Sequence, residues 1–397
     1  MTPVNAFRVR CAPRQARIGR VTLIRLLCVI AAMLAAVGGP PSTAAAAPGL
    51  DADLVRRLDA AIDQTLATAG VPGAIVGVFG PDGEYVRAIG VADKATGAPM
   101  EAGFFHRIGS LTKTFTVTAV LQLAGDGRLS LDDPIDRFVP GVPSGSVITL
   151  RQLARMQSGL PNYSANEEFA PALLADPQRP WTPQQLLAYA FAQPPVFPPG
   201  EGFQYSNTNT VLLGLVVEKV SGQPLHDVIR DRITGPLRMN DTAFPTGNAF
   251  PQPHAQGYTV QSADGREAVA TDWNPSWAWA AGAMTSTLAD LRIWAPALAN
   301  GTLVDPRLQQ ERLQTVGRDG RPAAHGYGLG LFNAGGWIGH NGSLPGYQTV
   351  AVYLPGRDLT LVIEVNTDET VDGTDPGTAM AVAVTRVLTP DNVYQLG

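Results

Sequence analysis

Strand-like runs near both ends of the chain enclose a middle that has the pattern of helices. Ala74 to Phe79 and Tyr85 to Val91 form two such runs, joined by a Pro-Asp-Gly turn at 81–83. Three more runs stand near the other end, at 326–332, 346–354 and 359–366. Two groups of strands so far apart in the chain are best accommodated in a single sheet to which both ends contribute.

Helical patterns flank these strands and fill the region between them. Apolar residues recur at helical spacing over 51–69 and 376–388, and these two helices could cover one face of the sheet. Between the strand groups, helical patterns occur at 110–124, 182–192 and 208–221. We therefore expect a three-layer α+β fold, in which an antiparallel sheet is flanked by helices and carries a mostly helical inserted subdomain.

The body of the chain, 47–397, is thus expected to be one domain with two parts. The sheet subdomain would comprise about 47–105 and 305–397, and the helical subdomain about 110–300. The crevice between two such parts is where an active site is expected.

The first 46 residues have the composition of an export signal. Six arginines precede any acidic residue, an apolar run from Leu26 to Val37 follows, and Ala44 to Ala46 offer small residues before a cut. The apolar run is shorter than the about 20 residues that a membrane span needs. We expect a signal peptide at 1–46 and a protein that is secreted or held in the cell envelope. An uncleaved membrane anchor is the alternative.

Removal of this segment restricts the chemistry that the chain can use. Both cysteines, Cys11 and Cys28, lie in it, so the mature protein would have no thiol nucleophile and no disulfide. The six arginines leave with it, which takes the formal net charge from −5 to −11 and argues against nucleic acid as a partner. The five histidines have no metal-ligand spacing, so we expect no metal site and no cofactor.

Ser110-Leu111-Thr112-Lys113 is the first of three patterns that carry chemistry. Residues three apart on a helix share a face, so the hydroxyl and the amine can meet. A lysine buried in an apolar helix can have its pKa lowered enough to take the proton of the serine hydroxyl. The serine also begins the helix, where exposed backbone N–H groups favour developing negative charge. A polar helix start with a solvated lysine is the alternative, but the flanks are apolar and lysine is scarce in this chain.

Two further patterns offer groups for proton transfer and carbonyl binding. Tyr205-x-Asn207 follows a Pro-Pro-Gly turn; a tyrosine can shuttle a proton, and an asparagine amide can hold a carbonyl group. His340-x-Gly342 precedes the strand expected near 346, and its glycine would let a substrate lie close against the strand edge. Taken alone, each pattern is more often structural than catalytic.

Together the three patterns resemble the serine β-lactamase and D-alanyl-D-alanine carboxypeptidase family, which carries a Ser-x-x-Lys signature. The similarity covers nearly the whole mature chain, from about residue 51 to about residue 390. The Tyr-x-Asn and His-x-Gly variants look closer to the class C-like carboxypeptidases, penicillin-binding proteins and esterases than to class A β-lactamases. The stretches that carry the resemblance are Phe105 to Ser110, Gly127 to Pro134, Ser158 to Leu160, Tyr205 to Asn209, Gly326 to Leu331 and His340 to Gly342.

The resemblance implies catalytic roles for four side chains. Ser110 would attack the substrate carbonyl, and Lys113 with Tyr205 would activate it and protonate the leaving group. His340 would sit beside Tyr205 and support its proton transfers. The implied activity is acyl-enzyme hydrolysis of the carboxypeptidase, β-lactamase or esterase type. Its substrate would be a small-molecule or peptide amide or ester, such as a peptidoglycan stem peptide or a β-lactam.

The resemblance also implies a set of substrate-binding groups. Asn207 would bind a substrate amide carbonyl, and Gly342 would keep the strand edge open to the substrate. The backbone N–H groups of Ser110 and Ser343 would form the oxyanion hole. Trp277 matches an aromatic residue that lines the cleft of the family, and a core or loop tryptophan is the alternative interpretation.

Two departures from the family pattern bear on the substrate. His-x-Gly stands where many β-lactamases of this branch carry Lys-Thr-Gly. Phe332 and Asn333 stand where a carboxypeptidase typically has an arginine that grips the terminal carboxylate of its substrate. Without that fixed positive charge the site lacks a bidentate clamp, so esters and other amides stay open beside D-Ala-D-Ala peptides.

Other interpretations fit the sequence less well. Asp132 and Asp133, beside Pro134, suit a turn and a helix cap better than a paired-carboxylate mechanism. Ser343 lacks the Gly-x-Ser-x-Gly elbow of a hydrolase nucleophile, because Asn341 precedes it by two residues. A non-catalytic module on the same scaffold, which binds cell-wall peptide or a protein, is the remaining alternative.

Overall fold

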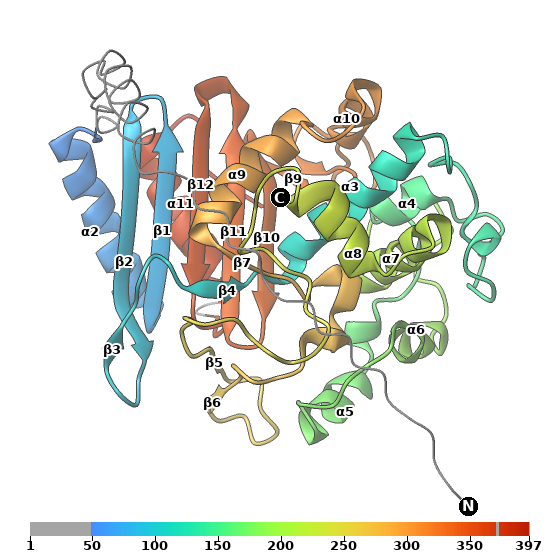
Figure 1. The fold of residues 1–397 in the computed structure, drawn as a ribbon, viewed down its shortest axis with the longest axis horizontal. Coiled ribbons are helices and arrows are strands. Elements are labelled where there is room, and N and C mark those ends of the chain that lie inside the picture. The colour runs from blue at the N-terminus through green and yellow to red at the C-terminus, as the bar shows by residue number, and fades with distance from the viewer. Residues whose placement is uncertain (1–48, 371–372, 397) are drawn as a thin grey trace, which may run out of the picture. The chain divides into compact units, whose positions relative to one another are not determined.

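An antiparallel sheet with helices on both faces forms the body of the protein (Figure 1). The computed structural model describes residues 49–370 and 373–396, and the predicted signal peptide at 1–46 lies outside them. In spatial order the eight strands of the sheet are β3 (Ala98–Pro99), β2 (Gly83–Asp93), β1 (Gly73–Gly80), β12 (Leu359–Val365), β11 (Tyr347–Leu354), β10 (Trp337–Leu344), β9 (Phe332–Ala334) and β8 (Gly326–Tyr327). The predicted α+β fold, with an antiparallel sheet and an inserted helical part, is confirmed.

The two ends of the chain meet in the middle of this sheet. β1 pairs with β12 in antiparallel register, so that Val76 lies opposite Ile363. The hairpin partner of β1 is β2, as the Pro-Asp-Gly turn predicts, and the hairpin partner of β12 is β11. Because alternate residues of a strand face opposite sides of the sheet, the buried strands β1, β11 and β12 contribute to the core on both faces.

Helices α2 (Ala52–Thr68) and α11 (Pro376–Leu388) cover one face of the sheet. The side chain of Asp51 caps α2 by accepting hydrogen bonds from the first backbone N–H groups of the helix. Ile62 of α2 and Met380 of α11 are fully buried in one apolar cluster with alternate residues of β1 and β12. The terminal helices therefore form the first layer, as their apolar spacing predicts.

The opposite face carries α9 (Leu288–Asn300) and the helical part of the chain (Figure 1). A second, larger apolar cluster joins this face of the sheet to α3 (Thr112–Gly125) and α7 (Asn207–Ser221). Helix α3 is buried almost all round, in agreement with its apolar sequence. The other helices and short strands of this part are β4 (Phe105–Arg107), α4 (Leu150–Ala154), α5 (Phe169–Ala175), α6 (Pro183–Phe191), α8 (Leu225–Ile229), β5 (Tyr258–Thr259), β6 (Ala268–Val269), β7 (Thr285–Thr287) and α10 (Pro306–Arg312).

The strand expected over 326–332 is wrong in its middle. β8 and β9 are short strands on either side of a turn, in which the N–H of Gly328 donates to the carbonyl of Leu331 at 2.9 Å. The next two N–H groups donate at 3.0 Å to the carbonyls of Arg312 and Ala154, which lie in other segments. These hydrogen bonds to neighbouring segments replace the ladder that a continuous strand would make.

The segment of His340 is a strand in its own right. β10 spans Trp337–Leu344 and pairs with β11, with His340 opposite Ala351. The expectation that His340 lies just before a strand is wrong, because it lies within one. Glycine stands at 339 and 342, and polar residues stand at 340 and 341. The segment therefore lacks the alternation of apolar residues that predicts a strand.

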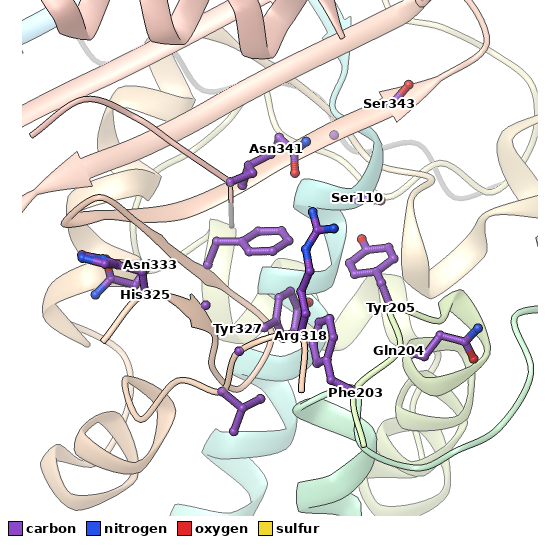
Figure 2. A pocket seen from close by; sticks show the side chains of 16 residues that line it. Ser110, Phe203, Gln204, Tyr205, Arg318, His325, Tyr327, Asn333, Asn341 and Ser343 are labelled. Carbon is purple, nitrogen blue, oxygen red and sulfur yellow. The ribbon is translucent and has the colours of Figure 1, made fainter. Parts of the chain in front are cut away.

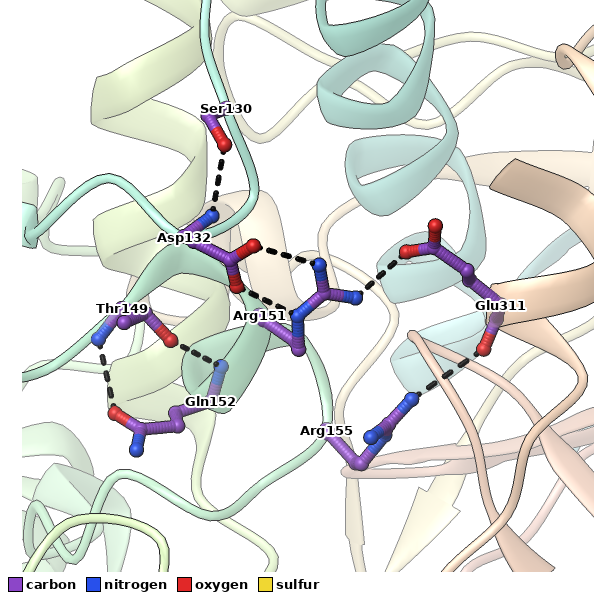
Figure 3. Close-up of polar contacts among 7 residues, drawn as sticks. All are labelled: Ser130, Asp132, Thr149, Arg151, Gln152, Arg155 and Glu311. Carbon is purple, nitrogen blue, oxygen red and sulfur yellow. Dashed lines mark hydrogen bonds and ion pairs between the residues drawn. The ribbon is translucent and has the colours of Figure 1, made fainter. Parts of the chain in front are cut away.

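Asp132 has a structural role at the junction of two helices (Figure 3). Its carboxylate accepts from Nε and Nη2 of Arg151 in α4, at 2.8 and 3.1 Å. Nη1 of the same guanidinium donates to Glu311 in α10 at 2.7 Å. The neighbouring Asp133 accepts from the backbone N–H of Ser130 at 2.8 Å. Both carboxylates therefore serve the fold, which agrees with the turn-and-cap interpretation.

No helix in 49–370 and 373–396 is both long enough and apolar enough to span a bilayer.

Replacing Glu364 with glutamine should stabilise the fold at neutral pH. Glu364 lies in β12, is 1% exposed, and neither carboxylate oxygen has a hydrogen-bond partner among the described residues. Burial raises its pKa well above the ordinary value of 4.5. The folded state therefore holds the proton more tightly than the unfolded state, so stability falls as pH rises above about 4.5. We expect Glu364→Gln to add about 1–3 kcal/mol to the free energy of unfolding at pH 7.5.

Urea unfolding at pH 4 and at pH 7.5 measures this effect. Below pH 4.5 both side chains are neutral, so the stability difference between variant and wild type should shrink. Glu369→Gln, at an exposed glutamate, is the control and should change little at either pH. An equal gain from Glu364→Gln at both pH values would contradict the account.

Candidate active site

Ser110 stands where the chain turns into α3, directly against strand β10. It lies in a short 3-10 helix, Gly109–Leu111, which runs on into Thr112–Gly125. Gly109 has φ +51°, and a Cβ built there would lie 2.6 Å from the backbone nitrogen of Ser343. A Cβ on Gly342 would lie 1.9 Å from the carbonyl oxygen of Ile108. Glycine is needed on both sides of this contact, so the role of Gly342 is to seat the serine segment against the strand.

Lys113 lies one helical turn from Ser110, on the same face of the helix. Its amine is fully buried, 2.9 Å from Oγ of Ser110 and 2.8 Å from the carbonyl oxygen of Ala281. Burial lowers the pKa of Lys113 well below its ordinary value of 10.5. No carboxylate among the described residues forms an ion pair with it that would hold the proton in place. A neutral amine at this distance can accept the proton of the serine hydroxyl.

Tyr205 approaches the same serine from the start of α7. Its ring centroid is 4.8 Å from Nζ of Lys113, and its hydroxyl points toward Ser110 in Figure 2. Burial raises the pKa of Tyr205, and the hydroxyl of Ser110 lowers it by a smaller amount. The Tyr205 hydroxyl is buried and makes no well-aligned hydrogen bond to any described residue. It is therefore a protonated group, close to the nucleophile, that can donate to an incoming atom.

His340 is a neutral histidine behind Tyr205. Nδ1 lies against the carbonyl of Asn341, which can only accept, so this nitrogen carries the proton. Nε2 then accepts from the hydroxyl of Tyr327 at 3.3 Å. Burial, and next the charge of Lys113, lowers the pKa of His340 to about 3. The ring of His340 is 6.1 Å from that of Tyr205, so the expected neighbourhood exists but the hydrogen bond goes to Tyr327.

A cavity of about 560 Å³ opens beside the nucleophile (Figure 2). Four of the predicted site residues line it, namely Ser110, Tyr205, Gly342 and Ser343. Phe203, Tyr327 and Phe332 form an aromatic wall, with ring centroids of Tyr327 and Phe332 4.7 Å apart. Arg318 and His325 add basic side chains, and both come from the loop between α10 and β8.

Two predicted substrate-binding residues are not among those that line this cavity. The amide nitrogen of Asn207 donates to Oγ of Ser164 at 3.0 Å, which fixes its orientation at the start of α7. Trp277 packs its ring 6.1 Å from that of Phe169, and its carbonyl accepts from the hydroxyl of Tyr163 at 2.7 Å. Trp277 is half-buried against the core cluster, so its assignment as a cleft residue stays a prediction.

Sequence reasoning missed three residues of this site. Tyr327 was predicted only as part of a glycine-rich strand, and Phe332 only as a residue that replaces an arginine, although both rings pack against His340. The expected arginine is absent at 332–333, but Arg318 lines the cavity from a different segment. The sequence offered no signal for Arg318, because the pairing of Val316 with Tyr327 that closes its loop forms only in the folded chain.

Within 49–370 and 373–396, no group of three or more His, Cys, Asp and Glu side chains is placed to hold a metal ion.

The chain matches one family model, described as Beta-lactamase, over residues 58–385. It is 28% identical to penicillin-binding protein 4* of Bacillus subtilis over 75% of this chain and 68% of the relative. It is 30% identical to a D-aminopeptidase of Cereibacter sphaeroides over 78% of this chain, and spans 59% of the length of that relative. A D-stereospecific amidohydrolase from Streptomyces sp. has a similar structure, with a TM-score of 0.75 and 31% identity over 84% of this chain and 98% of that chain.

Proposed function

This chain belongs to the β-lactamase family of serine hydrolases, and we propose that it cleaves an amide or ester through a covalent acyl-enzyme on Ser110. One observation carries the proposal: the amine of Lys113 is fully buried, lacks a carboxylate partner among the described residues, and lies 2.9 Å from Oγ of Ser110. A base of lowered pKa beside a hydroxyl is what nucleophilic catalysis by serine requires.

The acylation step moves one proton along three groups. Lys113 takes the proton of Ser110 as Oγ forms a bond to the substrate carbonyl carbon. The carbonyl oxygen then bears negative charge, which the backbone N–H groups of Ser110 and Ser343 stabilise. Tyr205 gives its proton to the leaving nitrogen or oxygen as that bond breaks, and recovers one from Lys113. A water molecule, activated by the same groups, then hydrolyses the Ser110 ester and restores the free hydroxyl.

The neutral His340 does not take part in the proton transfers between Ser110, Lys113 and Tyr205. Its Nε2 accepts from Tyr327, whose pKa burial raises well above 10, so neither group exchanges protons near neutral pH. Together they form an uncharged pair that packs against the ring of Tyr205. Such a pair positions the donor without competing for its proton.

We further propose that the acyl group is a D-amino acid or a peptide that ends in one. The support is the likeness to proteins described as a D-aminopeptidase and a D-stereospecific amidohydrolase. Hydrolysis of the D- and L-phenylalanine p-nitroanilides, with p-nitrophenyl acetate as a neutral reporter, tests this assignment. Faster turnover of the D-anilide supports it, and a preference for the L-anilide would contradict it. Absence of turnover on every compound would instead favour the non-catalytic binding module.

Export is a separate part of the proposal. The arginine-rich start, the apolar run and the small residues before Pro48 support a signal peptide that is removed after Ala46. Mass spectrometry of protein recovered from outside the cytoplasm should find a chain that starts at Ala47. An intact Met1 on that material would contradict cleavage.

A further inference from the structure

The cavity begins at the nucleophile and at the group assigned to protonate the leaving atom. Ser110 and Tyr205 both line it, and Tyr205 is the group that protonates the leaving atom in the proposed function. Asn207, the residue expected to hold the acyl part of the substrate, does not line it. Resting on that proposed function, the cavity is therefore a subsite for the leaving group, and its lining should describe that group.

The wall of the cavity is suited to a large apolar side chain. Phe203 and Phe332 both pack against Tyr327, with ring centroids 6.0 and 4.7 Å from it. Val316 and Leu396 add aliphatic surface. A volume of about 560 Å³ with this lining is far larger than a methyl group needs, so it suits an aromatic or branched side chain.

Arg318 adds a positive charge to this apolar subsite. It lies on an exposed turn, and in Figure 2 its side chain extends toward the Ser110 end of the cavity, between Tyr205 and Tyr327. An α-carboxylate is only two bonds from the nitrogen or oxygen of a leaving amino or hydroxy acid. A guanidinium at this end of the cavity is thus placed for the carboxylate of such a group.

The turn that carries Arg318 is held in place rather than loose. Its ends pair through Val316 and Tyr327, whose backbone groups exchange hydrogen bonds of 2.9 and 3.0 Å. Within the turn, the N–H of Gly317 donates to the carbonyl of Arg321 at 2.9 Å. The carbonyl of Gly320 accepts from Nε2 of Gln157 at 3.0 Å, which ties the turn to the helical part. A backbone held at both its ends and its tip reduces the ordering cost of binding.

We propose that this subsite selects leaving groups that combine a free α-carboxylate with a large apolar side chain, and that Arg318 binds the carboxylate. The substrate is then an acyl-amino acid or acyl-hydroxy acid. The bond between its acyl carbon and the leaving nitrogen or oxygen breaks as Oγ of Ser110 bonds to that carbon. The leaving group departs with the proton from Tyr205 and with its carboxylate still on Arg318.

A pair of esters that differ in one charge tests the proposal. One is the D-alanyl ester of racemic 3-phenyllactic acid, and the other is the matching ester of 3-phenyllactamide, so both carry the D-amino acid acyl group of the proposed function. Wild type should show kcat/KM about tenfold or more higher for the acid. Arg318→Met should remove that preference by lowering kcat/KM for the acid about tenfold, with the amide within about twofold. Arg318→Lys should retain part of the preference for the acid, and added salt should reduce that preference in wild type.

Arg321→Met is the matched control, since Arg321 is exposed on the same turn and does not line the cavity. It should leave the acid preference unchanged. Equal preference in wild type and Arg318→Met, with both active on p-nitrophenyl acetate, would overturn this proposal alone. If wild type hydrolyses none of these esters, the leaving-group proposal is overturned together with the proposed function.

Discussion

Replacing Ser110 with alanine should lower kcat/KM for p-nitrophenyl acetate by about ten-thousandfold or more and leave the fold intact. The change removes the atom that forms the acyl bond, and a nucleophile deleted from such a site leaves only binding and the oxyanion hole. The hydroxyl of Ser110 makes one hydrogen bond to Lys113 and lies close to the hydroxyl of Tyr205, so its loss should change the free energy of unfolding by less than about 1 kcal/mol.

Steady-state kinetics and urea unfolding of the same preparation measure both parts. Ser221→Ala is a control at the end of α7, where the hydroxyl makes a local hydrogen bond of 3.2 Å to the carbonyl of Gln223. It should hydrolyse the ester at the wild-type rate. Substantial turnover by Ser110→Ala would place the nucleophile elsewhere, with Ser343 as the other serine that lines the cavity.

Replacing Lys113 with methionine should lower kcat/KM by about a thousandfold, and it should not destabilise the fold. Methionine has nearly the length of lysine but no amine, so the proton of Ser110 loses its acceptor. The wild-type amine is fully buried without a carboxylate partner among the described residues. Burying such a polar group costs free energy of folding, and an apolar side chain avoids that cost. Lys219→Met, at an exposed lysine in the last turn of α7, is the control and should retain activity.

The pH dependence of the wild type reports on the same amine. Only neutral Lys113 can act as a base, so log kcat/KM should fall as pH drops through its lowered pKa. Because burial places that pKa well below 10.5, activity should already level off at a pH far below 10.5. A rate that continues to rise tenfold per pH unit up to 10.5 would show an ordinary lysine and contradict the assignment.

Much of the architecture follows from local pattern. The helix over 51–69 is α2, the helix over 376–388 is α11, and the runs at both ends of the chain are neighbours in the sheet. Their apolar spacing is regular and their ends carry turn or cap residues, so the sequence is sufficient. The close approach of Ser110 and Lys113 also follows from helical spacing alone.

The parts that could not be predicted depend on contacts between distant segments. β10 contains His340 and two glycines, and its strand geometry comes from pairing with β11 rather than from its own composition. The partner of His340 is Tyr327, which a turn stabilised by the carbonyls of Arg312 and Ala154 brings into place. Arg318 reaches the cavity from a turn that has no periodic pattern, so only the tertiary structure places it there.

Covalent labelling with an alkyl fluorophosphonate, followed by intact mass spectrometry and peptide mapping, tests the central claim most directly. The probe needs an activated serine and does not depend on the natural substrate. The account predicts one adduct on wild type, located on Ser110, no adduct on Ser110→Ala, and much slower labelling of Lys113→Met. An adduct on another residue, or equal labelling of wild type and Ser110→Ala, would contradict it.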